Sequence, residues 1–464
     1  MADNGVQSER VKRLNDRPIR KGRYVLYWMQ AAQREEYNHA LEYAAAKANR
    51  LGLPLLACFG LTDRFPGANL RHYAFMLEGL RETAAALSSR RGVALAVRRG
   101  PPDDVAIALS GDAALLVTDR GYLRVQREWQ RRVREKATCA VVQVETDVVV
   151  PVEVVSNKEE YAARTIRPRI HRHLSKFIVP IRRVGLRRGS MDLDVPGEDL
   201  SDIEGLLAAL DIDRSVPPSP LFRGGVREAK RRLRRFLRKG LAGYPRLRGE
   251  PALDGVSHMS PYLHFGQISP LYIALQARRA REAPVEAREA FLEELIVRRE
   301  LSMNFVLRNP KYDRYVALPA WARRSLARHA RDARPYRYGP KRLENARTHD
   351  PFWNAAQREM TITGKMHNTM RMYWGKKIIE WSASPEEAFR RALYLNNKYE
   401  LDGRDPNSFA GVAWCFGKHD RPWTERPVFG YVRYMNDRGL RRKYDMDAYL
   451  RKIASLEAPS CPTS

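Results

Sequence analysis

The stretch "YVLYWM" at residues 24–29 begins the pattern that decides the fold of this chain. An amphipathic stretch that ends in glycine follows at residues 35–52, and then a second apolar run, "PLLACFGL", at residues 54–61. Apolar runs that alternate with amphipathic stretches predict a parallel sheet with helices on both faces. The alternation continues with strand candidates at 93–99, 113–120 and 140–150 and helix candidates at 69–92, 102–110 and 126–137. We therefore predict an α/β domain over residues 23–150.

This predicted sheet lacks the two common phosphate-binding fingerprints. The sequence contains neither G-x-G-x-x-G nor G-x-x-x-x-G-K-[ST]. These glycine patterns mark ordinary dinucleotide-binding and P-loop domains. The sequence therefore excludes both classes, although the fold alone would have suggested them.

The second half of the chain has a helical pattern. "VREAKRRLRRFLRKGL" at residues 226–241 places leucines and Phe236 on one face and arginines on the other. We predict an all-helical domain over residues 226–456, joined to the first domain by a linker at 151–225 that contains the proline-rich "VPPSPLFRGG". Flexible tails are predicted at residues 1–22, which are basic, and at 457–464. Two domains also suit a chain of 464 residues.

The composition points to a polyanionic partner. The net charge is +29 and the isoelectric point is about 10.2, and nucleic acid is the commonest soluble polyanion. A generally basic surface is the alternative. The four cysteines form no close pair, so neither a zinc site nor a disulfide framework is indicated. Without a signal-like or membrane-length apolar run, we expect a cytoplasmic protein with no membrane partner.

Three stretches contain residues that could bind a ligand or take part in a reaction. In "GVSHMSPYLHFG" at 255–266, Ser257 and Ser260 could hold a phosphate at a helix start, or simply cap the helix. In "FLEELIVRRELSMNF" at 291–305, Glu294 could be a buried hydrogen-bonding acid, or an exposed partner of Arg298 one turn away. The polar stretch at 396–407 could contact the edge of a heteroaromatic ring, or form an ordinary surface loop.

Tryptophans mark a fourth stretch, "MHNTMRMYWGKKIIEW" at 366–381. Trp374 and Trp381 are seven residues apart, which separates them by about 10 Å along a helix and places them nearly on one face. Trp353 lies shortly before them in the sequence. Core packing explains such tryptophans, and an electron relay is the second interpretation.

In their order and spacing, these stretches resemble the DNA photolyase/cryptochrome family. The matching segments are "SPYLHFGQIS" (260–269), "EELIVRREL" (293–301), "MHNTMRMYW" (366–374) and "LDGRDPN" (401–407). The longer forms "GKMHNTMRMYWGKKIIEW" (364–381) and "ERPVFGYVRYMN" (425–436) resemble class II cyclobutane pyrimidine dimer photolyases. The resemblance extends from about residue 24 to about residue 455.

The resemblance implies a Rossmann-like α/β antenna domain and an all-α domain that binds FAD. It also implies light-dependent repair of cyclobutane pyrimidine dimers by electron transfer from photoexcited, reduced FAD. The expected partner is UV-damaged DNA, double- or single-stranded, and the enzyme is expected to be a monomer without an obligate protein partner, associated with the nucleoid when bound to DNA. An antenna chromophore of the deazaflavin or folate type is a further expectation.

The resemblance also assigns residues. Cofactor-binding residues are Tyr244, Ser257, His258, Met259, Ser260, Arg299, Asn368, Arg371, Asn396, Asp402 and Gly403. Catalytic residues are Glu294 towards the dimer, Asn396 towards the flavin, and Trp374, Trp353 and Trp381 as the relay. Substrate-binding residues by the resemblance are Glu294, Met372 and Trp414. We add the cations Arg298, Lys418, Arg433 and Arg441 as substrate-binding residues, because cations interleaved with aromatic side chains suit phosphates and bases. Asn368 departs from the class II pattern, in which we expect glycine at this position.

Three alternatives share parts of this pattern. A cryptochrome-type photoreceptor would bind FAD without repair, but Glu294, Met372 and Trp414 favour repair. A photolyase for (6-4) lesions uses a histidine pair near the lesion, which His258 and His367 do not obviously supply. A nonenzymatic nucleic-acid binder would not need the FAD-binding motifs.

Overall fold

The computed structural model describes residues 5–457, and the first half of the chain forms one six-stranded sheet. The strands are β1 (Val11–Arg13), β2 (Tyr24–Trp28), β3 (Leu55–Leu61), β4 (Leu95–Arg99), β5 (Ala113–Asp119) and β6 (Ala140–Val144), in the order β1-β6-β5-β2-β3-β4. All pairings are parallel except β1 with β6. Every residue of β2, β3 and β5 is buried, as expected for central strands covered on both faces. The predicted parallel α/β sheet is confirmed.

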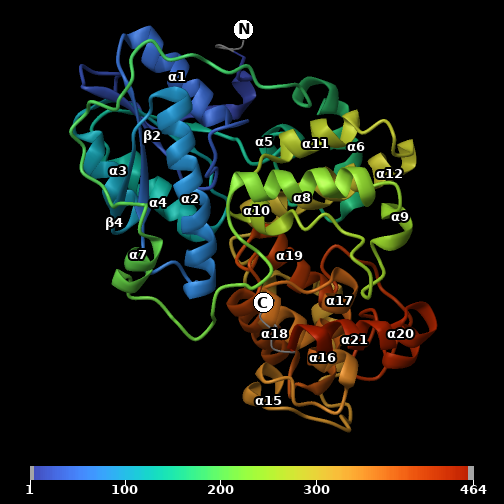
Figure 1. Cartoon of the computed structure of the whole chain (residues 1–464). Coiled ribbons are helices and arrows are strands. Elements are labelled where there is room, and N and C mark those ends of the chain that lie inside the picture. Colours follow the sequence, from blue (N-terminus) through green and yellow to red (C-terminus); the bar gives the residue numbers. More distant parts are fainter. Residues whose placement is uncertain (1–4, 458–464) are drawn as a thin grey trace, which may run out of the picture.

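Four helices cover the sheet. Helices α1 (His39–Leu51) and α2 (Leu70–Arg91) pack against one face, and α3 (Pro102–Ser110) and α4 (Arg124–Lys136) pack against the other (Figure 1). Alternate residues of β2 enter the two cores, because successive side chains of a strand point to opposite faces.

The chain before β2 is part of the sheet domain, so the prediction of a flexible tail is wrong for this segment. Strand β1 pairs with β6, and Val6 and Arg10 are each 2% exposed. The Arg10 guanidinium donates to the carbonyl oxygens of Glu145, Val148 and Val149. Residues 1–4 lie outside the described part of the chain. At the other end, Glu457 is the last residue of a helix, and the rest of the predicted tail is also outside the described residues.

The predicted linker contributes to both domains. Helix α6 (Ala163–Phe177) packs in the same core as Phe291 and Leu295 of the helical domain. Helix α7 (Ile203–Ala209) packs instead against the sheet domain through Leu206. The chain therefore enters the helical domain at α5 (Val152–Val155) and α6, returns along the sheet domain, and crosses again before α8 (Figure 1).

The remaining chain is helical, as predicted. Its helices are α8 (Val226–Lys239), α9 (Tyr244–Leu247), α10 (Ser260–His264), α11 (Pro270–Arg279), α12 (Val285–Leu292), α13 (Arg299–Arg308), α14 (Ala320–Arg328), α15 (Pro340–Glu344), α16 (Pro351–Thr363), α17 (Asn368–Trp381), α18 (Pro385–Tyr399), α19 (Pro406–Cys415), α20 (Asp437–Lys443) and α21 (Met446–Glu457). A π-helical turn, η2 (Glu293–Arg298), joins α12 to α13. Nowhere in residues 5–457 is a helix both long and apolar enough to span a bilayer.

Two buried arginines form hydrogen bonds between the two domains. Arg34 forms an ion pair of 3.0 Å with Asp147 and donates to the carbonyl oxygen of Gly266. Arg71 of α2 donates to the carbonyl oxygens of Met360 and Tyr399 in the helical domain. Each guanidinium thus satisfies buried carbonyls that would otherwise lack donors.

Candidate functional site

Three tryptophans lie in a row inside the helical domain. The rings of Trp353 and Trp374 are nearly parallel, with centroids 6.4 Å apart, and Trp353 meets Trp381 at 5.5 Å. Each is at most 1% exposed. The structure therefore brings the three predicted relay residues together in the order Trp374, Trp353, Trp381, at separations that allow an electron to pass between neighbouring rings.

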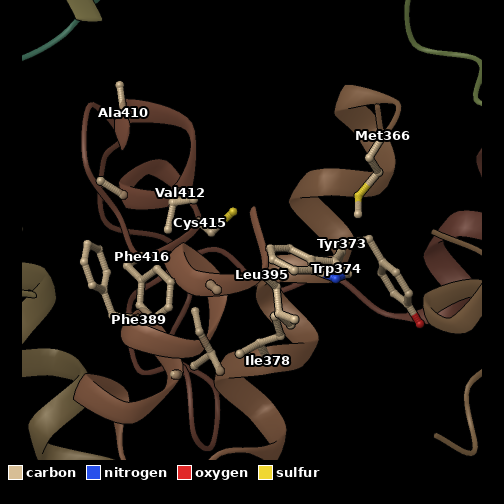
Figure 2. Packing of buried hydrophobic residues seen from close by; sticks show 14 of the residues in the cluster. Met366, Tyr373, Trp374, Ile378, Phe389, Leu395, Ala410, Val412, Cys415 and Phe416 are labelled. Carbon is tan, nitrogen blue, oxygen red and sulfur yellow. The ribbon is translucent and has the colours of Figure 1, made fainter. Parts of the chain in front are cut away.

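Hydrogen bonds and packing fix the first two rings. The Trp353 indole donates to the carbonyl oxygen of Trp374 at 3.0 Å, and the Trp374 indole donates to Oε1 of Gln357 at 2.8 Å. Figure 2 shows Trp374 beside Tyr373 on α17, close to Leu395 of α18. Buried indole N–H groups with partners favour one fixed ring orientation.

A group of charged residues, which we call the polar cluster, lies beside the start of α17. It consists of Ser260, Lys365, Arg371, Glu400 and Asp402. Lys365 donates to Oγ of Ser260 at 2.6 Å and lies 3.8 Å from Asp402. Arg371 pairs with Glu400 at 3.0 Å and lies 4.0 Å from Asp402. Two cations and two carboxylates are therefore interleaved in a buried space.

The carboxylates of the polar cluster differ in protonation. Burial has the largest effect on the pKa of Asp402 and would raise it, but Lys365 and Arg371 together hold this pKa well below its ordinary value. Burial raises the pKa of Glu400 to about 8, despite the opposing charge of Arg371. Asp402 is thus an anion at neutral pH, and Glu400 is poised to hold a proton.

Several buried polar atoms here have no hydrogen-bond partner within the described residues. They are Nε of Arg371, Oε2 of Glu400, Oδ1 of Asp402, Nδ1 of His258 and Nε2 of His367. Each such atom costs about 1–3 kcal/mol, which a polar ligand would relieve. A mixture of donors, acceptors and cations suits phosphates, ribose hydroxyls and the edge of a heteroaromatic ring. The residues therefore fit FAD.

Gly403 and Asn396 shape the turn beside the polar cluster. A Cβ on Gly403 would lie 2.9 Å from the carbonyl oxygens of Asn396 and Glu400, closer than real Cβ atoms come, so only glycine fits. Asn396 is 1% exposed, and its amide donates to the hydroxyl of Ser408. These contacts hold the end of α18 against the loop that carries Asp402.

The loop before α10 supplies the next predicted cofactor residues. His258 has a positive φ of 54° and pairs through Nε2 with Asp254. Burial lowers the pKa of His258. Met259 is 2% exposed and Ser257 is half-buried. Tyr244 lies at the start of α9, where burial raises its pKa to about 12.

Glu294 lies on the π-helical turn η2 and pairs with Arg248 at 2.6 Å. It does not pair with Arg298, so the alternative of an ordinary one-turn ion pair is wrong. Arg298 instead approaches Glu293 at 3.5 Å and lies over the ring of Trp414 at 5.5 Å. A π turn contains more residues than a turn of α-helix. Residues four apart, such as Glu294 and Arg298, are therefore not neighbours on one face of it.

Met372 and Trp414 come from α17 and α19. Sδ of Met372 is 3.9 Å from Sγ of Cys415, the residue after Trp414. Both Met372 and Trp414 are half-buried. They therefore offer apolar surface that remains accessible. We refer to Glu294, Met372 and Trp414, which are predicted to contact the dimer, as the lesion site.

The three outer cations predicted to bind substrate differ in their exposure and in the residues that they contact. Arg441 is exposed and lies over Phe352, and Arg433 stacks on Trp423 at 5.1 Å. Lys418 is only 6% exposed, pairs with Glu159, and donates to the carbonyl oxygen of Ala317. The structure contradicts a DNA contact for Lys418, because its ammonium group is already committed inside the protein.

Several predicted cofactor residues have no hydrogen bond to the polar cluster within residues 5–457, among them Arg299 and Asn368. Arg299 donates to the carbonyl oxygen of Asp147 at 2.6 Å, at the junction of the domains. Asn368 is exposed at the first residue of α17. Conversely, the sequence analysis missed Lys365, Glu400 and Arg248. Lys365 and Glu400 directly precede the quoted stretches "MHNTMRMYW" and "LDGRDPN", which is the signal that could have found them.

A separate cavity lies between the two domains. Its volume is about 740 Å³ with the open mouth included, and its wall mixes aromatic and polar side chains. The lining includes Gln30, Phe59, Phe65, Tyr73, Trp129 and Arg404. No sequence motif indicated this cavity, because its wall is assembled from distant segments.

Comparisons with known proteins agree with this geometry. A family model described as DNA photolyase matches residues 25–185. The deoxyribodipyrimidine photo-lyase of Methanothermobacter thermautotrophicus is 53% identical over 97% of this chain and 99% of its own length. That of Potorous tridactylus is 39% identical over 93% of this chain and 81% of its own length. The fold resembles an archaeal photolyase from Sulfolobus tokodaii solved with two FAD molecules, with a TM-score of 0.69, 18% identity, and coverage of 95% of this chain and 94% of that one. The chain belongs to the DNA photolyase family.

Proposed function

We propose that this chain repairs cyclobutane pyrimidine dimers in DNA with light, as a deoxyribodipyrimidine photo-lyase. The observation that carries the proposal is the arrangement along one turn of α17. Arg371 belongs to the polar cluster, Met372 to the lesion site and Trp374 to the tryptophan row. Helix α17 thus carries one residue of the proposed cofactor site, one of the lesion site and one of the electron relay. Full-length similarity to two curated photo-lyases supports the same conclusion.

The polar cluster is the proposed FAD site. Lys365 and Arg371 supply positive charge, and Asp402 supplies a fixed negative charge. Ser260 and the unpaired Nδ1 of His258 supply further hydrogen bonds. Asn396 presents a buried amide from the end of α18. When bound and reduced, FAD supplies the photoexcited electron that splits the dimer.

Residues of the lesion site would hold the dimer itself. Met372 and Trp414 would pack on the two pyrimidines after they leave the duplex, and the Glu294 carboxylate would accept a hydrogen bond from a pyrimidine N–H. Flipping two bases costs a few kcal/mol, and less for a lesion that already pairs badly. The half-buried Arg433 and the exposed Arg441 would contact phosphates on the rim. The proposal includes membership of class II, which the resemblance of the longer motifs at 364–381 and 425–436 supports.

The interdomain cavity is the proposed antenna site. Its aromatic wall suits a flat heteroaromatic chromophore of the deazaflavin or folate type, and Gln30 and Arg404 could hydrogen-bond its polar edge. We further propose that the enzyme is a cytoplasmic monomer that associates with the nucleoid on UV-damaged DNA, double- or single-stranded.

One pair of measurements separates this function from a photoreceptor without repair. The purified protein should show flavin absorption bands. The reduced protein should shorten the lifetime of dimers in a UV-irradiated oligonucleotide under blue light and not in darkness. Flavin bands without dimer loss would favour the photoreceptor, and a protein without flavin bands would contradict both.

A further inference from the structure

The outer face of α8 carries a row of cations beside a groove. The α8 groove is lined by Arg231, Arg234, Arg235, Leu237, Arg238 and Lys239 of α8 and by Gln276, Arg279 and Ala280 at α11. No carboxylate lines this groove. The five cations of α8 and Arg279 are all exposed.

Most of these cations are unpaired. Arg231 pairs with Glu228 at 2.6 Å. Across the described residues, the side chains of Arg234, Arg238, Lys239 and Arg279 make neither a hydrogen bond nor an ion pair. Like charges one turn apart on a helix repel by a few tenths of a kcal/mol per pair. Stability of the fold therefore does not explain the row.

Helix α4 offers a comparison, because acids lie beside several of its cations. Arg131 pairs with Glu128 at 2.5 Å and with Glu135 at 2.7 Å, and Arg132 pairs with Asp103 and Asp104. Nearby acids thus pair with Arg131 and Arg132 of α4, although not with Arg134 or Lys136, whereas Arg231 is the one groove cation in the described residues that forms an ion pair. This contrast indicates that the α8 groove faces an anionic ligand.

The length of the row fits a nucleic-acid strand. Arg231 and Lys239 are eight residues apart, which corresponds to about 12 Å along the helix. A DNA strand carries one phosphate for about every 3.4 Å of helix axis, so the row spans three to four phosphates. A single free phosphate would instead need donors that converge on one point. Arginine is suited to phosphates because its planar group presents several N–H donors.

Helix α8 lies between the groove and the region that leads to the proposed lesion site. On the inner face of α8, the ring of Phe236 lies 5.6 Å from that of Tyr244, and Arg248, after α9, pairs with Glu294. Figure 1 shows α8 running towards α9. The groove therefore lies on the opposite side of this helix, whose diameter is about 10 Å, and the exposed Arg246 follows Lys239 along the chain.

We propose that the α8 groove is a second DNA-binding surface, which holds the phosphodiester backbone of DNA outside the lesion site. The proposal rests on the proposed function, because it extends the path of the same DNA. It adds affinity that is independent of base sequence and of the lesion. Short substrates that occupy only the lesion site gain no affinity from the α8 groove.

Two triple variants with equal loss of charge test this surface. The groove variant is Arg234→Gln/Arg238→Gln/Lys239→Gln, and the control is Arg131→Gln/Arg134→Gln/Lys136→Gln on α4. The holoenzyme is titrated with an undamaged duplex of roughly 30 base pairs at several salt concentrations. The groove variant should bind at least tenfold more weakly at low salt, and the slope of log affinity against log salt should fall by about 2 to 3 relative to the control. Equal slopes in the two variants would overturn the proposal.

Repair of a thymine-dimer dinucleotide separates this proposal from the proposed function. The dinucleotide cannot reach the groove, so wild type and the groove variant should repair it equally. A slower repair by the groove variant alone would contradict a role confined to the backbone. Failure of all three proteins would contradict the proposed function, and the salt slopes would still decide whether the groove binds DNA.

Discussion

Trp353 and Trp374 lie with their ring planes within 7° of each other, and the Trp353 indole donates to the backbone carbonyl of Trp374 at 3.0 Å. The hydrogen bond ties one ring to the backbone that carries the other, so their spacing is fixed. Trp381 extends the row by an edge contact with Trp353. Hydrophobic packing alone requires neither three tryptophans in a row nor a hydrogen bond between Trp353 and Trp374. Electron transfer along the row requires a fixed distance between neighbouring rings.

Replacing Trp353 should break the row at its middle. In Trp353→Phe, the light-driven reduction of oxidised flavin should slow at least tenfold, because the path from Trp381 to Trp374 is lost. Repair by the chemically reduced variant should persist. The measurement is the decay of flavin absorbance under blue light. Trp321→Phe, which changes a partly buried tryptophan outside the row, is the control. Normal photoreduction in Trp353→Phe would remove the relay role.

Replacing Glu294 should affect repair and not cofactor binding. Its carboxylate is paired with Arg248 and is 37% exposed, so it lies outside the polar cluster. Glu294→Gln should lower the number of dimers split per absorbed photon several-fold, because a charge-assisted hydrogen bond is about twice as strong as a neutral one. Glu293→Gln, one residue away and paired with Arg167, should leave the yield near wild type. An unchanged yield in Glu294→Gln would count against its contact with the dimer.

Replacing Asp402 should weaken FAD binding. Asp402 is the anion that faces both Lys365 and Arg371. The variant Asp402→Asn removes the negative charge that pairs with these two cations. A lost hydrogen bond to a charged group costs about 1.5–3 kcal/mol, which predicts roughly tenfold to hundredfold weaker binding. Flavin retained after dialysis measures the effect, with the exposed Asp447→Asn as control. Full flavin occupancy in Asp402→Asn would contradict the assignment of the polar cluster.

Glu300 predicts a pH dependence of stability. Burial raises its pKa to about 8, although it accepts hydrogen bonds from the backbone N–H groups of Val149 and Val150. Because the folded state holds the proton more tightly, this contribution to stability is present below pH 4.5 and is lost as the pH rises towards 8. The slope is about 1.4 kcal/mol per pH unit within this window.

The variant Glu300→Gln should remove this slope. Its thermal midpoint should fall less between pH 5 and pH 8 than that of wild type, and the exposed Glu282→Gln should behave like wild type. Parallel pH profiles of Glu300→Gln and wild type would show that Glu300 is not protonated in the folded protein.

Local patterns in the sequence predicted the elements that local residues determine. The apolar runs of β2, β3 and β5 identified the sheet, because parallel strands are buried on both faces. Strand β1 was missed, because its sequence "VKR" is polar and its place depends on pairing with β6, more than a hundred residues away. Buried Arg10 likewise gave no local signal, since its partners are distant carbonyl groups.

The candidate site shows the same division. Residue type and spacing left two interpretations open for the tryptophans and for the polar loop, and the family resemblance predicted their roles. The partner of Glu294 was not, because a π turn interrupts the helical repeat on which that reasoning depends. Lys418 was assigned to DNA from its charge, and only the fold shows that Glu159 binds it inside the protein.

The central claim is that the helical domain uses light to split a dimer held at the lesion site. The most direct test is to illuminate the fully reduced enzyme with a UV-crosslinked thymine oligonucleotide and follow the return of thymine absorbance. The account predicts that monomeric thymines reappear under blue light, with no change in darkness. If the crosslinked thymines persist under illumination while flavin is bound and reduced, the account is contradicted.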